Sequence, residues 1–539
     1  MNSTRWVLPR ALSLSFLAAV VTVGTAAAQY YDPALRALDL TPGQVARSPR
    51  LLGMGGLSSV IPDRDNQTNL WDFAAFPVGL ASDDSTSSLD IRPGTNTLSS
   101  ARTLPFGRER QNLAARGTFI GAEAVYRNRE SGSLFGVVGD LSGLRWDQPF
   151  SNVIERRQGL THPEVMTVLG GKLPRLFDNH VAWAAHLRFR NESTKDQYRS
   201  IVSNAAGEWI GLGGAQLDPP SEFTPTTTRV NTTAYGFSTE YQMGQSTHFA
   251  LGIEQEANRL KGLNELPRSS SEVTEDRPYW VGHAAWVGKV GKTFEYGING
   301  ISRVSDSEQK WRFTTSAGVG GVALTGRGNL STRAEKAHEV QARLRWLPGK
   351  AVFSGTVATA AHKITIDPPN ANDATSLNRF INIAFNRDGA DSLALPDSIG
   401  HVESRRYAFA AGGGASYRFG RTTLGGEYHW ARDAREATNA GVGPQRIAWD
   451  ARIGLERPLG NGLMGRLGYQ FRNVDEDDRL TGNEYTANAF AVGFGYQPTG
   501  MRWSFESGYR IEFRDQDFND PNEEHQSRQN LAMQLHFAL

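Results

Sequence analysis

The sequence of 539 residues contains no cysteine. This absence excludes a disulfide-stapled scaffold, a cysteine-ligated metal centre and a cysteine nucleophile. The sequence also has no marked surplus of positive or negative charge, because it contains 57 Lys and Arg residues and 56 Asp and Glu residues. General nucleic-acid-binding proteins usually carry a basic surplus. After residue 28 there is no apolar run of about 20 residues, which excludes a helical membrane protein.

Glycine and aromatic residues are abundant instead, with 57 Gly, 26 Phe, 15 Tyr and 12 Trp. Glycine thus exceeds its usual share of about 7%, and together with the aromatics it favours β structure. The length alone fits several soluble domains, but it also fits one large barrel. The order of residues along the chain therefore has to decide between them.

Residues 1–28 have the three parts of a secretory signal peptide. Arg5 and Arg10 are the only charges in the first ten residues, an apolar run follows over 11–23, and alanines at 26–28 precede the expected cleavage. An uncleaved anchor is the alternative, but the run is shorter than the about 20 residues of a membrane-spanning helix. We therefore expect the mature chain to leave the cytoplasm.

Apolar and polar residues alternate strictly in many later segments. Period two places successive side chains on opposite faces of a β-strand. In residues 502–514 the apolar face holds Trp503, Phe505, Tyr509, Ile511 and Phe513, and the other face holds the charges Arg502, Glu506, Arg510, Glu512 and Arg514. The same alternation occurs over 181–189, 340–346, 446–456 and 463–472. These segments predict strands with one apolar and one charged face.

The connections between these segments fall into two classes. Short turns are expected at 242–245, 347–350, 419–421, 458–462 and 497–500, and they alternate with long polar connections at 192–228, 259–278, 366–401, 433–445 and 514–529. A soluble β-sandwich is the alternative, but its strands average about 5–6 residues and its turns show no such order. Short turns at one rim and long loops at the other are typical of outer-membrane barrels.

Eight hairpins are predicted, at 113–146, 163–191, 229–259, 279–304, 336–365, 402–434, 445–476 and 484–514. A last strand at 530–539 needs a partner, which we place near 87–92. The predicted fold is all-β: a transmembrane antiparallel β-barrel over residues 85–539, with about 18 strands (range 14–18), since bacterial barrels have even strand numbers. The expected location is the outer membrane.

Charged residues of the alternating segments should line the lumen, because on the lipid face each would cost about 2–4 kcal/mol near the midplane. The predicted lumen-lining residues are Arg343, Arg345, Arg446, Asp450, Arg452, Glu456, Arg466, Arg472, Arg502, Glu506, Arg510, Glu512 and Arg514. They permit two arrangements, a polar conduit that favours anions or ion pairs that narrow the interior. We favour pairing around an N-terminal plug.

The C-terminal strand alternates to the last residue of the chain. It resembles the terminal strand by which the barrel-assembly machinery recognises its clients, with Phe537 and Leu539 as the signal residues. The usual terminal Phe is replaced by Leu539, and Phe537 stands two positions earlier. The resemblance implies that this machinery is a partner during assembly.

Residues 29–84 do not alternate. They contain Leu52-Gly53-Met54-Gly55-Gly56 and, some 20 residues later, a Pro-Val-Gly-Leu run at 77–80. This resembles the N-terminal signature of the long-chain fatty-acid outer-membrane transporter superfamily, which also includes a type IX secretion shuttle protein. The resemblance implies a hatch folded inside the barrel, with Gly53, Met54, Gly55, Gly56, Pro77, Gly79 and Leu80 as hatch residues. A periplasmic linker with a glycine turn is the alternative.

The sequence indicates no catalytic or metal site. Its 11 histidines are scattered, without metal-ligand spacing or a Gly-x-Ser-x-Gly elbow, so no enzyme activity and no cofactor or metal is expected. Acidic runs at 475–478 and 515–520 fall in expected external loops, where divalent ions could bridge them to lipopolysaccharide. Outer-membrane lipid, including lipopolysaccharide, is therefore an expected partner, and nucleic acid is not.

The leading functional hypothesis is a channel that passively admits hydrophobic or amphipathic small molecules through a hatch-gated lumen. The absence of an ATP-binding motif agrees with passive movement. A non-transport anchor or shuttle for secreted proteins is the alternative, as in the other branch of the resemblance. A barrel hydrolase is a third possibility, but no residue pattern in the sequence supports it.

Overall fold

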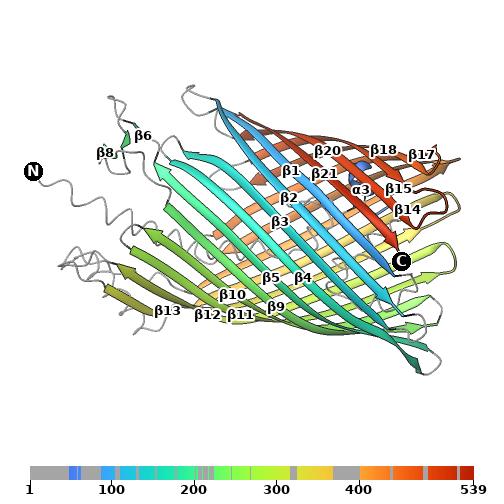
Figure 1. Ribbon diagram of the computed structural model, residues 1–539, viewed down its shortest axis with the longest axis horizontal. Helices are drawn as coiled ribbons and strands as arrows, with labels where there is room; N and C mark the ends of the chain where they lie inside the picture. The colour runs from blue at the N-terminus through green and yellow to red at the C-terminus, as the bar shows by residue number, and fades with distance from the viewer. Residues whose placement is uncertain are drawn as a thin grey trace, which may run out of the picture.

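The computed structural model (Figure 1) describes residues 48–57, 59–61, 87–103, 110–128, 133–151, 154–176, 179–200, 202–203, 209–210, 216–217, 224–244, 246–266, 269–315, 324–367, 401–437, 441–477, 483–518 and 523–539. Their secondary structure is β apart from one short helix, α3 (Pro49–Gly53). Within this part of the chain, no helix is long and apolar enough to cross a membrane. The predicted signal peptide, residues 1–28, lies outside the described residues.

Eighteen antiparallel strands form one closed sheet, which confirms the predicted fold class. The strands are β1 (Ser88–Thr103), β2 (Arg110–Arg127), β3 (Leu134–Ser151), β4 (Ile154–Leu176), β5 (Asn179–Ser200), β9 (Thr224–Met243), β10 (Thr247–Leu266), β11 (Ser269–Val290), β12 (Phe294–Thr315), β13 (Leu324–Trp346), β14 (Ala351–Asp367), β15 (Val402–Phe419), β16 (Thr422–Ala437), β17 (Gly441–Gly460), β18 (Leu463–Asp477), β19 (Asn483–Tyr496), β20 (Trp503–Phe518) and β21 (Glu523–Ala538).

Each strand pairs with the next one along the chain, and β21 returns to β1 to close the barrel. The predicted partner near 87–92 for the last strand is thus correct. The two-residue strands β6 (Val202–Ser203), β7 (Trp209–Ile210) and β8 (Gln216–Leu217) form a small separate sheet between β5 and β9.

The short turns lie together at one end of the barrel (Figure 1). At the other end β10 runs to Leu266 and β11 begins at Ser269, so the predicted long connection at 259–278 is wrong. Tight turns need residues with positive φ, which glycine adopts without steric cost. Gly291 and Gly420 supply it between β11 and β12 and between β15 and β16, with φ of 65° and 59°. A one-residue slip would turn each strand's apolar side chains inward, so these turns hold the register.

The strands are longer than the alternating segments from which they were predicted, of which 502–514 is the longest. They range from the 14 residues of β19 to the 23 residues of β4 and β13. A tilted strand crosses a bilayer in about 9–11 residues. The ladders therefore continue beyond the membrane, on the side of the long connections.

Burial alternates along the strands as the sequence predicts. On β10, Leu251 and Ile253 are 48% and 55% exposed, whereas Glu254 and Glu256 are buried. Exposed large apolar residues also surround the barrel on other strands, among them Ile120, Leu169, Phe189, Tyr235, Trp280, Leu344, Phe409, Tyr428, Ile453 and Phe490. A closed barrel with an apolar outer band and an inward charged face is an outer-membrane barrel.

Candidate functional site

A short N-terminal segment lies inside the barrel against the inner face of the wall. We call residues 48–57 and 59–61 the inner segment. It begins with α3, whose first turn is capped by Ser48, since the Ser48 hydroxyl accepts from the Leu51 N–H at 3.3 Å. Gly55 and Gly56 follow with φ of 74° and 83°, a conformation that glycine adopts readily. Helix α3 contacts β18 to β21, near the end with the short turns (Figure 1).

The wall carries glycines where the inner segment touches it. Gly425 and Gly454 stand opposite each other on β16 and β17, Gly454 opposite Gly468 on β18, and Gly493 on β19 opposite Gly508 on β20. We call these five residues the glycine track.

A side chain at these positions would collide with the segment. A Cβ on Gly493 would lie 2.9 Å from the Gly53 Cα, and a Cβ on Gly468 would overlap the Gly55 backbone. The glycine track thus lets backbone pack directly on backbone.

One charged clamp holds the start of the inner segment. Arg50 donates from Nε and Nη2 to the two oxygens of Glu456, both at 2.8 Å. Arg466 donates from Nε to Glu456 at 2.7 Å and also pairs with Glu506 through both Nη atoms. Bidentate guanidinium–carboxylate pairs fix geometry as well as charge, so β17, β18 and β20 position Arg50 together.

A second clamp holds the other end of the segment. Glu427 on β16 is buried, and its Oε1 accepts from the Ser59 N–H at 2.6 Å, the Ser59 hydroxyl at 3.0 Å and the Val60 N–H at 2.8 Å. The Ser416 hydroxyl on β15 donates to the Val60 carbonyl at 2.9 Å. These bonds satisfy backbone groups that a non-helical chain inside a barrel would otherwise leave unpaired.

Three arginines from the predicted lumen set donate to carbonyls of the inner segment. Arg343 and Arg345 on β13 donate to the Ser59 oxygen at 3.2 and 2.9 Å. Arg452 on β17 donates to the Gly56 oxygen at 2.5 Å while it holds Asp450 with two bonds of 2.8 and 2.9 Å. The inner segment is therefore held from strands β13 to β20.

The other predicted lumen residues form pairs around this region. Glu512 lies between Arg510 and Arg514, with contacts of 2.5 and 3.3 Å. Arg472 lies 3.9 Å from Asp450, and Arg446 donates to the Tyr485 hydroxyl at 3.1 Å.

Arg502 differs from its prediction. It is exposed in the turn before β20, because that strand begins only at Trp503. Its carbonyl accepts from the Ala538 N–H at 2.7 Å, so it belongs to the rim of the barrel rather than to the lumen.

A second charge network on the opposite part of the wall was not predicted. Arg188 on β5 donates to Glu254 at 2.7 Å and to Glu256 at 3.0 Å, and Arg303 on β12 donates to Glu256 at 3.0 Å. His186 lies 2.5 Å from Glu254. Their inward positions follow from strand alternation, but the shared carboxylates depend on cross-strand register. The network braces β5, β10 and β12 against one another.

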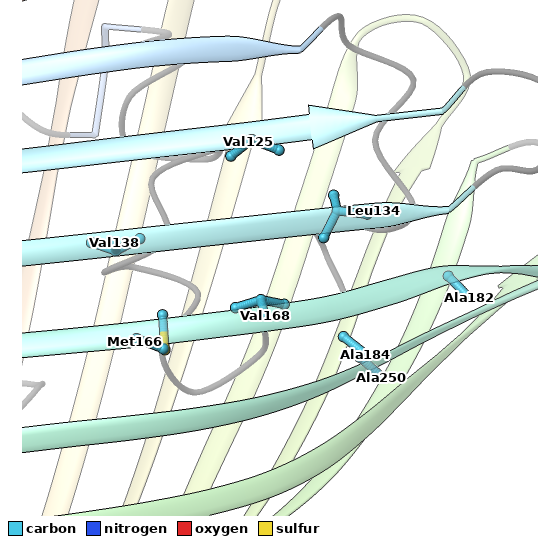
Figure 2. Packing of buried hydrophobic residues seen from close by; sticks show 8 residues of the cluster. All are labelled: Val125, Leu134, Val138, Met166, Val168, Ala182, Ala184 and Ala250. Atoms are coloured by element: carbon cyan, nitrogen blue, oxygen red, sulfur yellow. The ribbon is translucent and has the colours of Figure 1, made fainter.

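The inner wall also has an apolar region, which the sequence reasoning missed. Figure 2 shows its buried side chains on β2 to β5 and β10: Val125, Leu134, Val138, Met166, Val168, Ala182, Ala184 and Ala250. All eight occupy inward positions of their strands, at the places where other strands carry charges. Each strand adds only one or two of these residues, so the region is visible only once the strands are side by side.

Of the predicted hatch residues, Gly53, Met54, Gly55 and Gly56 belong to the inner segment, and Met54 is fully buried. Pro77, Gly79 and Leu80 lie outside the described residues, as does most of the predicted 29–84 hatch, so its bounds stay a prediction. Among the described residues no group of His, Asp and Glu could hold a metal ion.

No family model matches the sequence, and no curated protein matches it either. Solved structures do match the fold. The toluene transporter TodX of Pseudomonas putida aligns with a TM-score of 0.36 and 10% identity, covering 91% of this chain and 97% of that chain. A FadL homologue of Pseudomonas aeruginosa aligns with a TM-score of 0.34 and 10% identity, covering 92% and 99%.

The ferric citrate transporter FecA aligns with a TM-score of 0.41 and 8% identity, covering 84% of this chain and 79% of that chain. FadL-type barrels, the group that the N-terminal motif resembles, thus stand among the structures to which this chain is similar. At these identities the likeness concerns the fold, and the function has to be argued from the site itself.

Proposed function

We propose that the protein is an outer-membrane channel that passively admits hydrophobic or amphipathic small molecules, and that the inner segment gates its lumen. The main observation behind this proposal is the position of the inner segment. It packs on the glycine track, and Glu456 and Glu427 bind its two ends. The two clamps are side-chain contacts and not strand pairings, so they can be broken without opening the strand ladders that close the barrel.

The apolar inner wall supports a hydrophobic substrate. A lumen lined only by charges would favour ions or polar solutes, whereas ligand sites for apolar molecules are lined mainly by apolar side chains. The names of TodX and related structures, which include a monoaromatic hydrocarbon channel, suggest aromatic hydrocarbons as probes. We further propose that the chain reaches the outer membrane after removal of residues 1–28, which N-terminal sequencing of the mature protein would test.

A reversible lock tests the gate. A Cβ on Gly425 would meet only side-chain atoms, and Val60 Cγ2, whose place a cysteine sulfur would take, lies 3.3 Å from it, within the reach of a disulfide. The double variant Val60→Cys/Gly425→Cys should therefore cross-link the inner segment to β16. Because the chain has no other cysteine, oxidation can form only this bridge within one molecule.

In proteoliposomes, we expect oxidation to stop uptake of toluene and of oleate, and reduction to restore it. Each single cysteine variant serves as a control, since it carries one of the two substitutions and cannot form the bridge within one molecule. Equal uptake by the oxidised and reduced double variant, with the cross-link verified by mass spectrometry, would show that the segment does not gate the lumen.

A further inference from the structure

The outer surface of the barrel beyond the apolar band carries charges, and between β10 and β11 they form cross-strand ion pairs. On β10 and β11, Arg259 lies 3.7 Å from Asp276 and Lys261 lies 3.1 Å from Glu272. Arg259 and Asp276 are direct cross-strand partners in the register. Opposite charges placed across strands stabilise a sheet modestly. Lys261 also stands opposite Arg229 on β9, but each of the two β10 cations has a carboxylate partner on β11.

On strands β13, β14 and β15, by contrast, cations stand opposite cations. Lys336 stands directly opposite Lys363, and Lys363 directly opposite Arg405. We call these three residues the basic row. Like charges directly opposite each other destabilise a sheet, so such a row costs stability unless an anion lies against it.

The basic row is only partly neutralised by the protein. Glu403 accepts from Lys363 Nζ at 2.8 Å and also from Arg405 Nε, so two cations share one carboxylate. The side chains of Lys363 and Arg405 remain 44% and 49% exposed. Lys336 is exposed and forms no ion pair with any residue that the structure describes. Glu436 on β16 stands opposite Arg405 and is exposed, so three cations face two carboxylates and a net positive patch faces outward.

Along the barrel axis, the basic row lies at the level expected for the outward-facing surface of the membrane. Its members stand ten to fourteen residues from the short-turn ends of their strands, at Trp346, Ala351 and Phe419, and an apolar span takes about 9–11 residues. Directly below Arg405 on the same face of β15 are Tyr407 and Phe409, both more than 40% exposed. Exposed aromatic residues mark the level of lipid headgroups.

We propose that the basic row binds the phosphate groups of lipopolysaccharide in the outer leaflet. The long connections mark the outward side of the barrel, where that lipid is found, and phosphate is the anion that complements a row of Lys and Arg. Three neighbouring strands at a spacing of about 4.8 Å place the cations within the width of one phosphorylated headgroup. This inference concerns the outer surface and stands whether or not the inner segment gates the lumen.

The test compares two matched double variants of the full-length protein in detergent. Lys336→Gln/Lys363→Gln removes two cations from the basic row, and Arg259→Gln/Lys261→Gln removes two balanced cations at a similar height on β10. Native mass spectrometry would measure binding of bisphosphorylated lipid A and of lipid A stripped of its phosphates. At about fivefold per basic residue, the first variant should weaken binding of bisphosphorylated lipid A roughly 25-fold, and the second should leave it nearly unchanged.

Binding to wild-type protein should also fall with rising salt and be much weaker for the dephosphorylated lipid. Equal losses in both double variants would overturn the proposal, because the binding would then follow overall charge. Equal affinity for the phosphorylated and dephosphorylated lipids would overturn it as well. Gel mobility of unheated samples establishes that both variants retain the folded barrel.

Discussion

At the scale of single residues, one carboxylate oxygen accepts an unusually large number of hydrogen bonds. Glu427 Oε1 accepts three hydrogen bonds from Ser59 and Val60, and the other oxygen, Oε2, lies 2.9 Å from His429 Nε2. Hydrogen bonds to a charged group contribute about 1.5–3 kcal/mol, more than neutral ones. The attachment of the inner segment at this end therefore depends on the charge of Glu427.

Removing that charge should loosen the segment without breaking the barrel. Glu427→Gln keeps the shape and one acceptor oxygen but weakens the bonds to Ser59 and Val60 by about 1–2 kcal/mol, that is about 5- to 30-fold in the open population. We expect a several-fold higher frequency of open events in planar bilayers. Glu436→Gln, on the exposed face of the same strand, is the control. If both variants conduct like the wild type, Glu427 does not hold the gate.

At the scale of elements, the sequence predicted the faces of the strands but not their partners across the lumen. Period two is a local property, so it placed Glu456 and Arg466 on the inner face. The partner of Glu456 is Arg50, 406 positions away in the chain, and no local pattern indicates such a contact. Glu427 was missed because the first five residues of its strand, Thr422 to Gly426, carry no charge.

The predicted strands were too short for a related reason. Alternation of apolar and polar residues is visible only where one face meets lipid. On β10 the outward face changes from Leu251 and Ile253 to Arg259 and Lys261 while the ladder continues to Leu266. Both faces of that outer part are polar, and the hydrophobic signal of the strand disappears although its hydrogen bonds remain.

The glycine track yields an element-scale prediction. Gly468→Ala adds a Cβ that would overlap the Gly55 backbone, and backbone cannot move aside as a flexible side chain can. We expect the inner segment to detach from the wall of the barrel. The variant should then conduct more than the wild type in planar bilayers and be cleaved faster between residues 48 and 61. Thermal stability of the barrel should be unchanged, since alanine suits a strand better than glycine.

Gly355→Ala on β14 is the matched control, because nothing lies within 4 Å of a Cβ at that position. It makes the same chemical change in the same kind of strand. If Gly468→Ala and Gly355→Ala give the same conductance and the same cleavage rate, the segment does not pack on the glycine track.

At the scale of the whole molecule, closure of the barrel depends on its first and last strands. β1 and β21 pair over most of their length, and the Leu539 N–H donates to the Ser87 carbonyl at 2.8 Å. Phe537 stands opposite Leu89 on β1 and Trp503 on β20, so it contributes to the outer surface at the seam. The same residue is one of the two predicted to identify the chain to the assembly machinery.

These two roles of Phe537 can be separated by comparing cells with purified components. If Phe537 is an assembly signal, Phe537→Ala should lower the folded fraction in cell membranes several-fold, yet refolding into lipid vesicles without other proteins should be nearly normal. Phe513→Ala is the control, because it removes an outward aromatic side chain from the neighbouring strand β20. It should lower folding in cells and refolding in vesicles slightly and to the same extent. A parallel loss of folding for Phe537→Ala in cells and in vesicles would mean that Phe537 acts only through the stability of the seam.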